Sequence, residues 1–84
     1  MTNEQVEKVL TPTAFSKIVN ISFKTRNNLR GMFVAGNDYE DLKTKNFWRV
    51  IAESRIEEWR KTNDMGLGRI YSGSDFTKLV VQVQ

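Results

Sequence analysis

Basic side chains are the residues of this sequence whose types and spacing most directly suggest chemistry. The segment from Phe15 to Gly36 carries four of them and no acidic residue, and a second group lies within residues 43–49. Lysine and arginine neutralise phosphates, and a protruding pair of strands can reach the backbone or a groove of a nucleic acid. The candidate nucleic-acid-binding residues are Lys17, Lys24, Arg26, Arg30, Lys43, Lys45 and Arg49. The nearby aromatic residues that would stack on bases if exposed are Phe23, Phe33, Trp48 and Trp59.

Catalytic chemistry has little support in the composition. The 84 residues include no histidine and no cysteine, which removes the commonest general base, the commonest metal ligand and the thiol nucleophile. Asp38, Glu40 and Asp41 offer oxygen ligands, but their spacing matches no calcium-binding loop and is typical of a solvated segment. Gly66 and Gly68 follow a helix candidate rather than a strand, which is the wrong context for a dinucleotide-binding loop. We therefore expect a non-enzymatic protein without a metal or cofactor.

A β-hairpin over residues 15–36 is expected to position the first basic group. Apolar and polar side chains alternate from Phe15 to Thr25, which is typical of a half-buried strand. An apolar return strand then runs from Leu29 to Ala35, with Gly31 as a candidate bulge. Asn27 and Asn28 are predicted to form the turn between the strands, because asparagine tolerates the left-handed conformation that a tight hairpin requires.

The segment from Phe47 to Met65 has two interpretations. Its apolar residues fit one face of a helix of about four turns. Its first residues also fit a strand, after which Ser54 has capping-box spacing that would begin a short helix ending near Thr62. We favour the strand and short helix, because aromatic and β-branched residues cluster at the start. Gly66 or Gly68 is then the expected left-handed cap, and two further strands, 69–71 and 76–83, follow.

These patterns predict a single small α+β domain over residues 1–84. Residues 1–13 are expected to be partly disordered or to form a short helix around Glu4 to Leu10, ended by Pro12. The remainder is predicted to be a mainly antiparallel sheet of four or five strands with one helix around residues 47–63. An open SH3-like barrel is one form of this architecture, and a longer helix packed across the sheet is the alternative.

Two kinds of partner fit the pattern. The first is a nucleic acid bound through the basic hairpin. The alternative is a protein partner or a second copy of the chain, paired with the strand Met32 to Ala35 or with Leu79 to Val83 in an adaptor or self-associating domain. The polar start is unlike a secretory signal, and no apolar run approaches the ~18 residues that span a bilayer. A cytoplasmic location without a membrane partner is therefore expected.

Overall fold

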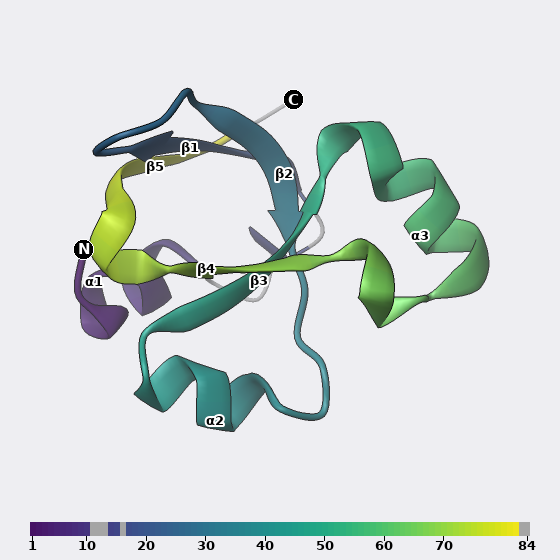
Figure 1. The fold of residues 1–84 in the computed structure, drawn as a ribbon, viewed down its shortest axis with the longest axis horizontal. Coiled ribbons are helices and arrows are strands. Elements are labelled where there is room, and N and C mark those ends of the chain that lie inside the picture. Colours follow the sequence, from purple (N-terminus) through teal and green to yellow (C-terminus); the bar gives the residue numbers. More distant parts are fainter. Residues whose placement is uncertain (11–13, 16, 83–84) are drawn as a thin grey trace.

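The computed structural model of the chain is an α+β fold built on one antiparallel sheet (Figure 1). It describes residues 1–10, 14–15 and 17–82. The sheet has five strands in the order β4-β3-β2-β1-β5, so that the first four form a meander and the fifth returns to pair with the first. Their bounds are β1 (Val19–Phe23), β2 (Leu29–Phe33), β3 (Phe47–Ala52), β4 (Arg69–Ser72) and β5 (Phe76–Val81). The predicted α+β class and strand number are confirmed.

The helical elements are short and connect the strands. The α-helices that the structure describes are α1 (Asn3–Val9), α2 (Tyr39–Thr44) and α3 (Ile56–Thr62). The tighter 3₁₀ turns are η2 (Glu53–Arg55), η3 (Met65–Leu67) and η4 (Gly73–Asp75). Across residues 1–10, 14–15 and 17–82, no helix has the length and apolar character needed to cross a membrane. In the same residues no ladder joins the edge strands β4 and β5, so the sheet is open and does not close into a barrel.

The larger apolar core lies on the sheet face that α1 contacts. The predicted alternation in the first strand is confirmed, because Val19, Ile21 and Phe23 are buried there. Phe33 and Trp48 join them at 1% exposure, with ring centroids 6.5 Å apart in an edge-to-face contact. Phe23, Phe33 and Trp48 are therefore core residues and are not available to stack on a base.

A second, smaller core cluster lies on the opposite face. Met32, Val34, Ile51 and Ile56 are buried in it, and Trp59 packs against them from α3. This cluster explains why β2 is apolar on both faces: it is an interior strand of the sheet, covered on two sides, as its composition predicts. In Figure 1 the helix α3 stands well apart from α1, with the sheet between them.

The hairpin is real, but its ends and its turn differ from the prediction. The first strand begins at Val19, because Phe15 lies in a helical turn and packs edge-on against Tyr39 at 5.7 Å between ring centroids. The strands are joined by residues 24–28, a loop long enough to need no left-handed residue. Neither Asn27 nor Asn28 has a positive φ, so the predicted turn type is wrong. Ser16 lies outside the described residues.

Gly31 does not mark a bulge. It has regular partners on both sides, Val19 in β1 and Ala52 in β3. The register shift lies instead between Ser22 and Phe23 in the ladder of β1 with β5. The predicted final strand is otherwise found, and its last predicted residue, Val83, lies outside the described residues.

The favoured division of the segment after Phe47 is confirmed. A strand occupies Phe47–Ala52, and α3 follows after the η2 turn. The predicted capping box does not form, because Ser54 lies within η2 and no side chain caps α3. The helix ends at Asn63, which has φ 53° and donates its N–H to the carbonyl of Trp59 at 2.7 Å. No glycine has a positive φ, so the predicted glycine cap is wrong.

The first residues of the chain contact the η4 turn and the start of β5. Thr2 and Gln5 form a capping box that begins α1, which is the short helix expected in this region. The α-amine of Met1 donates to the carbonyls of Gly73 at 2.8 Å and Phe76 at 3.0 Å. The start of the chain is thereby tied to the η4 turn between β4 and β5. Pro12, the predicted end of this helix, lies outside the described residues.

Candidate functional site

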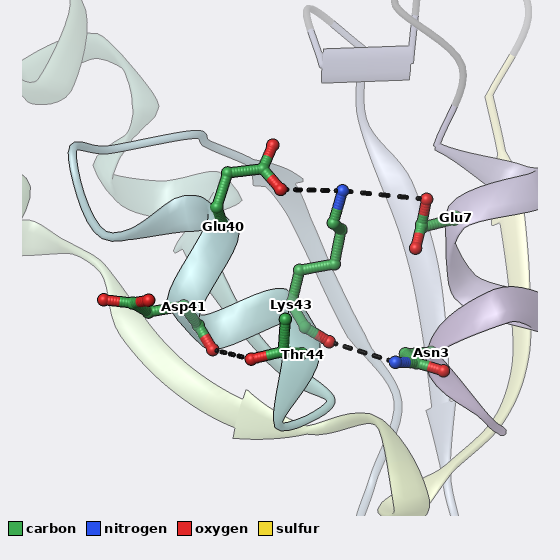
Figure 2. Close-up of polar contacts among 6 residues, drawn as sticks. All are labelled: Asn3, Glu7, Glu40, Asp41, Lys43 and Thr44. Atoms are coloured by element: carbon green, nitrogen blue, oxygen red, sulfur yellow. Dashed lines mark hydrogen bonds and ion pairs between the residues drawn. The ribbon is translucent and has the colours of Figure 1, made fainter.

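Lys43 is engaged by carboxylates rather than free for a phosphate. Its Nζ lies 3.0 Å from Glu40 Oε2 and 3.9 Å from Glu7 Oε2, as Figure 2 shows. Its backbone carbonyl also accepts a hydrogen bond from Asn3 Nδ2 at 3.3 Å. The hydrogen bond to Glu40 raises the pKa of Lys43, because it favours the charged ammonium. The side chain and backbone of Lys43 therefore join α2 to α1.

Arg49 is likewise held in an ion pair. Its guanidinium donates from Nη1 to Asp38 Oδ1 at 2.6 Å and from Nη2 to Asp38 Oδ2 at 2.9 Å, a bidentate fork on a side chain only 15% exposed. This pair fixes the segment before α2 on the surface of β3. With Glu40 bound to Lys43, the acidic segment serves to neutralise neighbouring cations. In the part of the chain that the structure describes, no three acidic side chains gather as a metal site.

The ion pair of Asp38 predicts a dependence of stability on pH. The hydrogen bond from Arg49 lowers the pKa of Asp38 below its ordinary value of 3.8. The carboxylate therefore stabilises the folded state above pH 3.8, and this contribution is lost as the pH falls through the lowered folded-state pKa. We expect Asp38→Asn to lower the urea midpoint at pH 7, and the difference from the unsubstituted protein to shrink below pH 3.8.

Asp41→Asn is the matched control for this prediction, because Asp41 is exposed and forms no ion pair with any described residue. Its substitution should leave the urea midpoint nearly unchanged at both pH values. A difference between the Asp38→Asn variant and the unsubstituted protein that stays constant from pH 7 to pH 2 would contradict the assigned role of the carboxylate.

Arg30 lies apart from the rest of the predicted hairpin site. Its Nη2 donates to Gln82 Oε1 at 2.8 Å and lies 3.3 Å from Glu53 Oε2. By the alternation of β2, Arg30 shares the sheet face of Met32, which belongs to the smaller core cluster on the α3 side. Arg30 therefore does not extend the basic surface of the β1–β2 loop.

The remaining predicted residues are exposed and form no ion pair among the described side chains. Lys17 precedes β1, Lys45 follows α2, and Lys24 and Arg26 lie in the β1–β2 loop. In Figure 1, α2 lies on the opposite side of the view from this loop. Of the predicted site residues, the structure thus leaves Lys24 and Arg26 as neighbouring free cations and places the Lys43, Lys45 and Arg49 group elsewhere.

Arg26 is held over two aromatic rings. Its guanidinium carbon lies 5.2 Å from the centroid of Phe23 and 5.4 Å from that of Tyr71. The two rings contact each other at 5.5 Å between centroids. This arrangement gives the guanidinium a fixed position by cation–π attraction while its N–H groups remain exposed to solvent. The positive charge of Arg26 therefore lies on the sheet face that carries the larger core.

Tyr71 also lines a pocket of about 300 Å³ beside β3 and β4. Its lining includes the apolar residues Val50 and Ala52 and the exposed residues Arg55 and Arg69. Arg69 reaches this face because β3 and β4 pair it with Val50, and Arg55 because η2 follows β3 directly. Neither arginine forms an ion pair within the described ranges, and no acidic residue lines the pocket. The remaining lining comes from Ser54, Gly66 and Leu67.

The chemistry of this site is that of an anion receptor. Two guanidinium groups offer the forked donors that fit phosphate or carboxylate oxygens. The N–H of Gly66 is not available as a third donor, because it binds Asp64 Oδ1 at 2.9 Å. Neither Arg55 nor Arg69 is among the site residues predicted from the sequence. They line one pocket because β3 pairs with β4 and continues into η2, an arrangement for which the sequence contains no motif.

Comparison with known proteins found no significant match among family models, curated proteins or solved structures. Function must therefore be inferred from the arrangement of the side chains. The most informative arrangement is the placement of Arg26, Arg55 and Arg69 around Tyr71, since Tyr71 contacts Arg26 and lines the pocket with the other two.

Proposed function

We propose that this protein is a non-enzymatic nucleic-acid-binding domain that contacts phosphates through Arg26, Arg55 and Arg69. The observation that carries the proposal is that Arg26 lies over the Tyr71 ring, that Arg55 and Arg69 line the same pocket as Tyr71, and that none of the three has a carboxylate partner among the described residues. Lys43 and Arg49, in contrast, are already neutralised by acidic neighbours. A free guanidinium binds phosphate without first breaking an ion pair, so these arginines gain more from a nucleic acid than Lys43 or Arg49 would.

Of the site residues predicted from the sequence, we retain Lys24 and Arg26 of the β1–β2 loop. Arg55 and Arg69 take the place of the other predicted residues. Lys24 adds a positive charge to the loop beside Arg26. Phosphate contacts carry little sequence information, so binding is expected to be largely independent of base sequence. The logarithm of affinity should fall with the logarithm of salt concentration by about 0.9 per phosphate contacted on a duplex and about 0.7 on a single strand. The proposal includes a cytoplasmic location.

Charge reversal in the loop tests this function. We expect the double variant Lys24→Glu/Arg26→Glu to bind a labelled mixed-sequence oligonucleotide at least about tenfold more weakly and with a shallower salt slope, because it removes two phosphate contacts and adds repulsion. Fluorescence anisotropy at low and moderate salt measures both quantities. The loss should be similar for every base sequence, since phosphates are being contacted.

The double variant Lys17→Glu/Lys45→Glu is a matched control, because it changes the net charge equally at exposed positions away from Tyr71. It should weaken binding much less than the loop variant. Equal losses in the two variants would reduce the effect to net charge, and no loss in either would remove the loop from the nucleic-acid interface. The anisotropy of the unsubstituted protein at low salt tests whether binding occurs at all.

A second candidate function is self-association through a free sheet edge. Ile70 in the edge strand β4 is 48% exposed, and its diagonal neighbour Phe47 is 38% exposed on the same face. Val80 in the other edge strand is 45% exposed. The segment from Met32 to Ala35 is not an available edge, because β2 is paired on both sides. Light scattering at the titration concentrations distinguishes the candidates, since a mass that rises with concentration supports self-association and a constant monomer mass opposes it.

A further inference from the structure

The pocket beside Tyr71 differs from the rest of the proposed interface in being hollow. Its volume of about 300 Å³ lies at the lower end of the range for small-molecule sites. Such a space accepts one base or one small ring but not the stacked base pairs of a duplex. Its lining combines the apolar residues Val50 and Ala52 with the cationic residues Arg55 and Arg69.

Ala52 leaves space in the pocket because its side chain is a single methyl group. Gly31 pairs with Ala52, and both lie on the face that carries Val50 and Tyr71. A larger side chain at Ala52 would occupy the space above this pair. The residues that line the pocket come from the strands β3 and β4 and from the turns η2 and η3.

The charges in the lining favour a ligand with one anionic group beside a flat apolar one. Arg55 and Arg69 come from two different elements, η2 and β4, and both line the pocket, so that one phosphate bound there can receive donors from both side chains. A base beside that phosphate would contact Tyr71 and Ala52. Bases present their faces for such contacts only when they are unpaired and unstacked.

We infer that this pocket binds one unpaired nucleotide of a single strand, with its phosphate between Arg55 and Arg69 and its base against Ala52 and Tyr71. This inference rests on the proposed nucleic-acid function and adds the class of nucleic acid, single-stranded rather than duplex. The β1–β2 loop with Lys24 and Arg26 then contacts the backbone of the neighbouring nucleotides. Single strands should bind more tightly than duplexes of the same length.

The test compares a labelled ten-residue oligothymidylate with a ten-base-pair duplex, using fluorescence anisotropy at one moderate salt concentration. The informative variant is Ala52→Leu, which places a larger apolar side chain in the pocket lining without changing the charge. We expect Ala52→Leu to weaken binding of the single strand by about tenfold, because one base loses its contact. Binding of the duplex should not change. Arg69→Gln should also weaken the single strand more than the duplex.

The outcomes separate this inference from the function on which it rests. If Ala52→Leu leaves the single strand unaffected while Lys24→Glu/Arg26→Glu still weakens both probes, the pocket inference is overturned and the proposed function stands. If neither probe binds the unsubstituted protein at low salt, both fail. If Ala52→Leu weakened binding of a labelled oligoglutamate peptide but not of oligothymidylate, the pocket would be assigned to an acidic peptide and the inference would be overturned. Arg69→Gln, an exposed change, keeps the test decisive if Ala52→Leu disturbs the sheet.

Discussion

Replacing Gly73 with alanine is expected to lower the free energy of unfolding by about 2 to 3 kcal/mol. A Cβ at this position would overlap the side-chain oxygen of Asn46 and lie 2.7 Å from its Cγ. Asn46 has no free direction in which to move, because its Oδ1 accepts from Trp48 Nε1 at 2.8 Å and its Nδ2 donates to the carbonyl of Met1 at 2.9 Å. Turning Asn46 away would leave the indole N–H of a buried tryptophan without its acceptor, at a cost of about 1 to 3 kcal/mol.

The measurement for Gly73→Ala is urea unfolding, in which the midpoint should fall while the slope stays constant. A double-mutant cycle with Trp48→Phe tests the reason, because phenylalanine has no N–H that requires Asn46. Gly73→Ala should cost less in the Trp48→Phe background than in the unsubstituted protein. Equal costs in the two backgrounds would contradict the role assigned to the indole, and a cost under about 0.5 kcal/mol would contradict the predicted overlap.

The sequence predicted those elements whose signals are local. The alternation of Val19, Ile21 and Phe23 identified the buried face of β1, since side chains of a strand alternate between its faces whatever the partner strand is. The division between β3 and α3 was also predictable, because β-branched and aromatic residues at the start of the segment favour a strand. Both predictions rest on patterns within a few residues.

The sequence did not reveal which asparagines adopt the left-handed conformation. Asn27 and Asn28 were predicted to do so, but Asn46 and Asn63 are the asparagines with a positive φ, at 61° and 53°. Asn27 and Asn28 do not need it, because residues 24–28 form a longer loop. The choice depends on the length of each connection and on the bonds that Asn46 makes with Met1 and Trp48, which are distant or tertiary contacts.

The basic surface was harder to predict because ion pairs form between elements. The acidic segment was expected to be solvated, but Asp38 pairs with Arg49 and Glu40 pairs with Lys43. Both of these cations had been predicted to bind a nucleic acid. Arg69, in contrast, was not predicted although it has no ion pair among the described residues. Its position beside the pocket follows from the register between β3 and β4, which the sequence does not show. Attraction and register across elements, rather than charge along the chain, therefore decide which cations are free.

Gly31→Ala is expected to destabilise the fold by about 3 kcal/mol. Gly31 lies in the middle of β2, which is paired on both sides, and the Cβ of alanine would lie 2.6 Å from the carbonyl oxygen of Ile51 and 2.7 Å from Val50 Cγ1. The carbonyl belongs to the backbone of β3 and has no rotamer to change. The two strands must therefore separate locally, which weakens the ladder that carries Met32 opposite Ile51.

Urea unfolding measures this cost, and two further variants test its cause. Arg30→Ala changes the neighbouring residue and removes an exposed ion pair with Glu53 and an exposed hydrogen bond to Gln82, so it should cost under about 1 kcal/mol. In the background of Val50→Ala, the overlap with Cγ1 disappears and that with the Ile51 carbonyl remains. Gly31→Ala should therefore still be destabilising there, though less so. If Val50→Ala abolished the cost entirely, side-chain crowding and not the approach of the β3 backbone would be the reason that this position requires glycine.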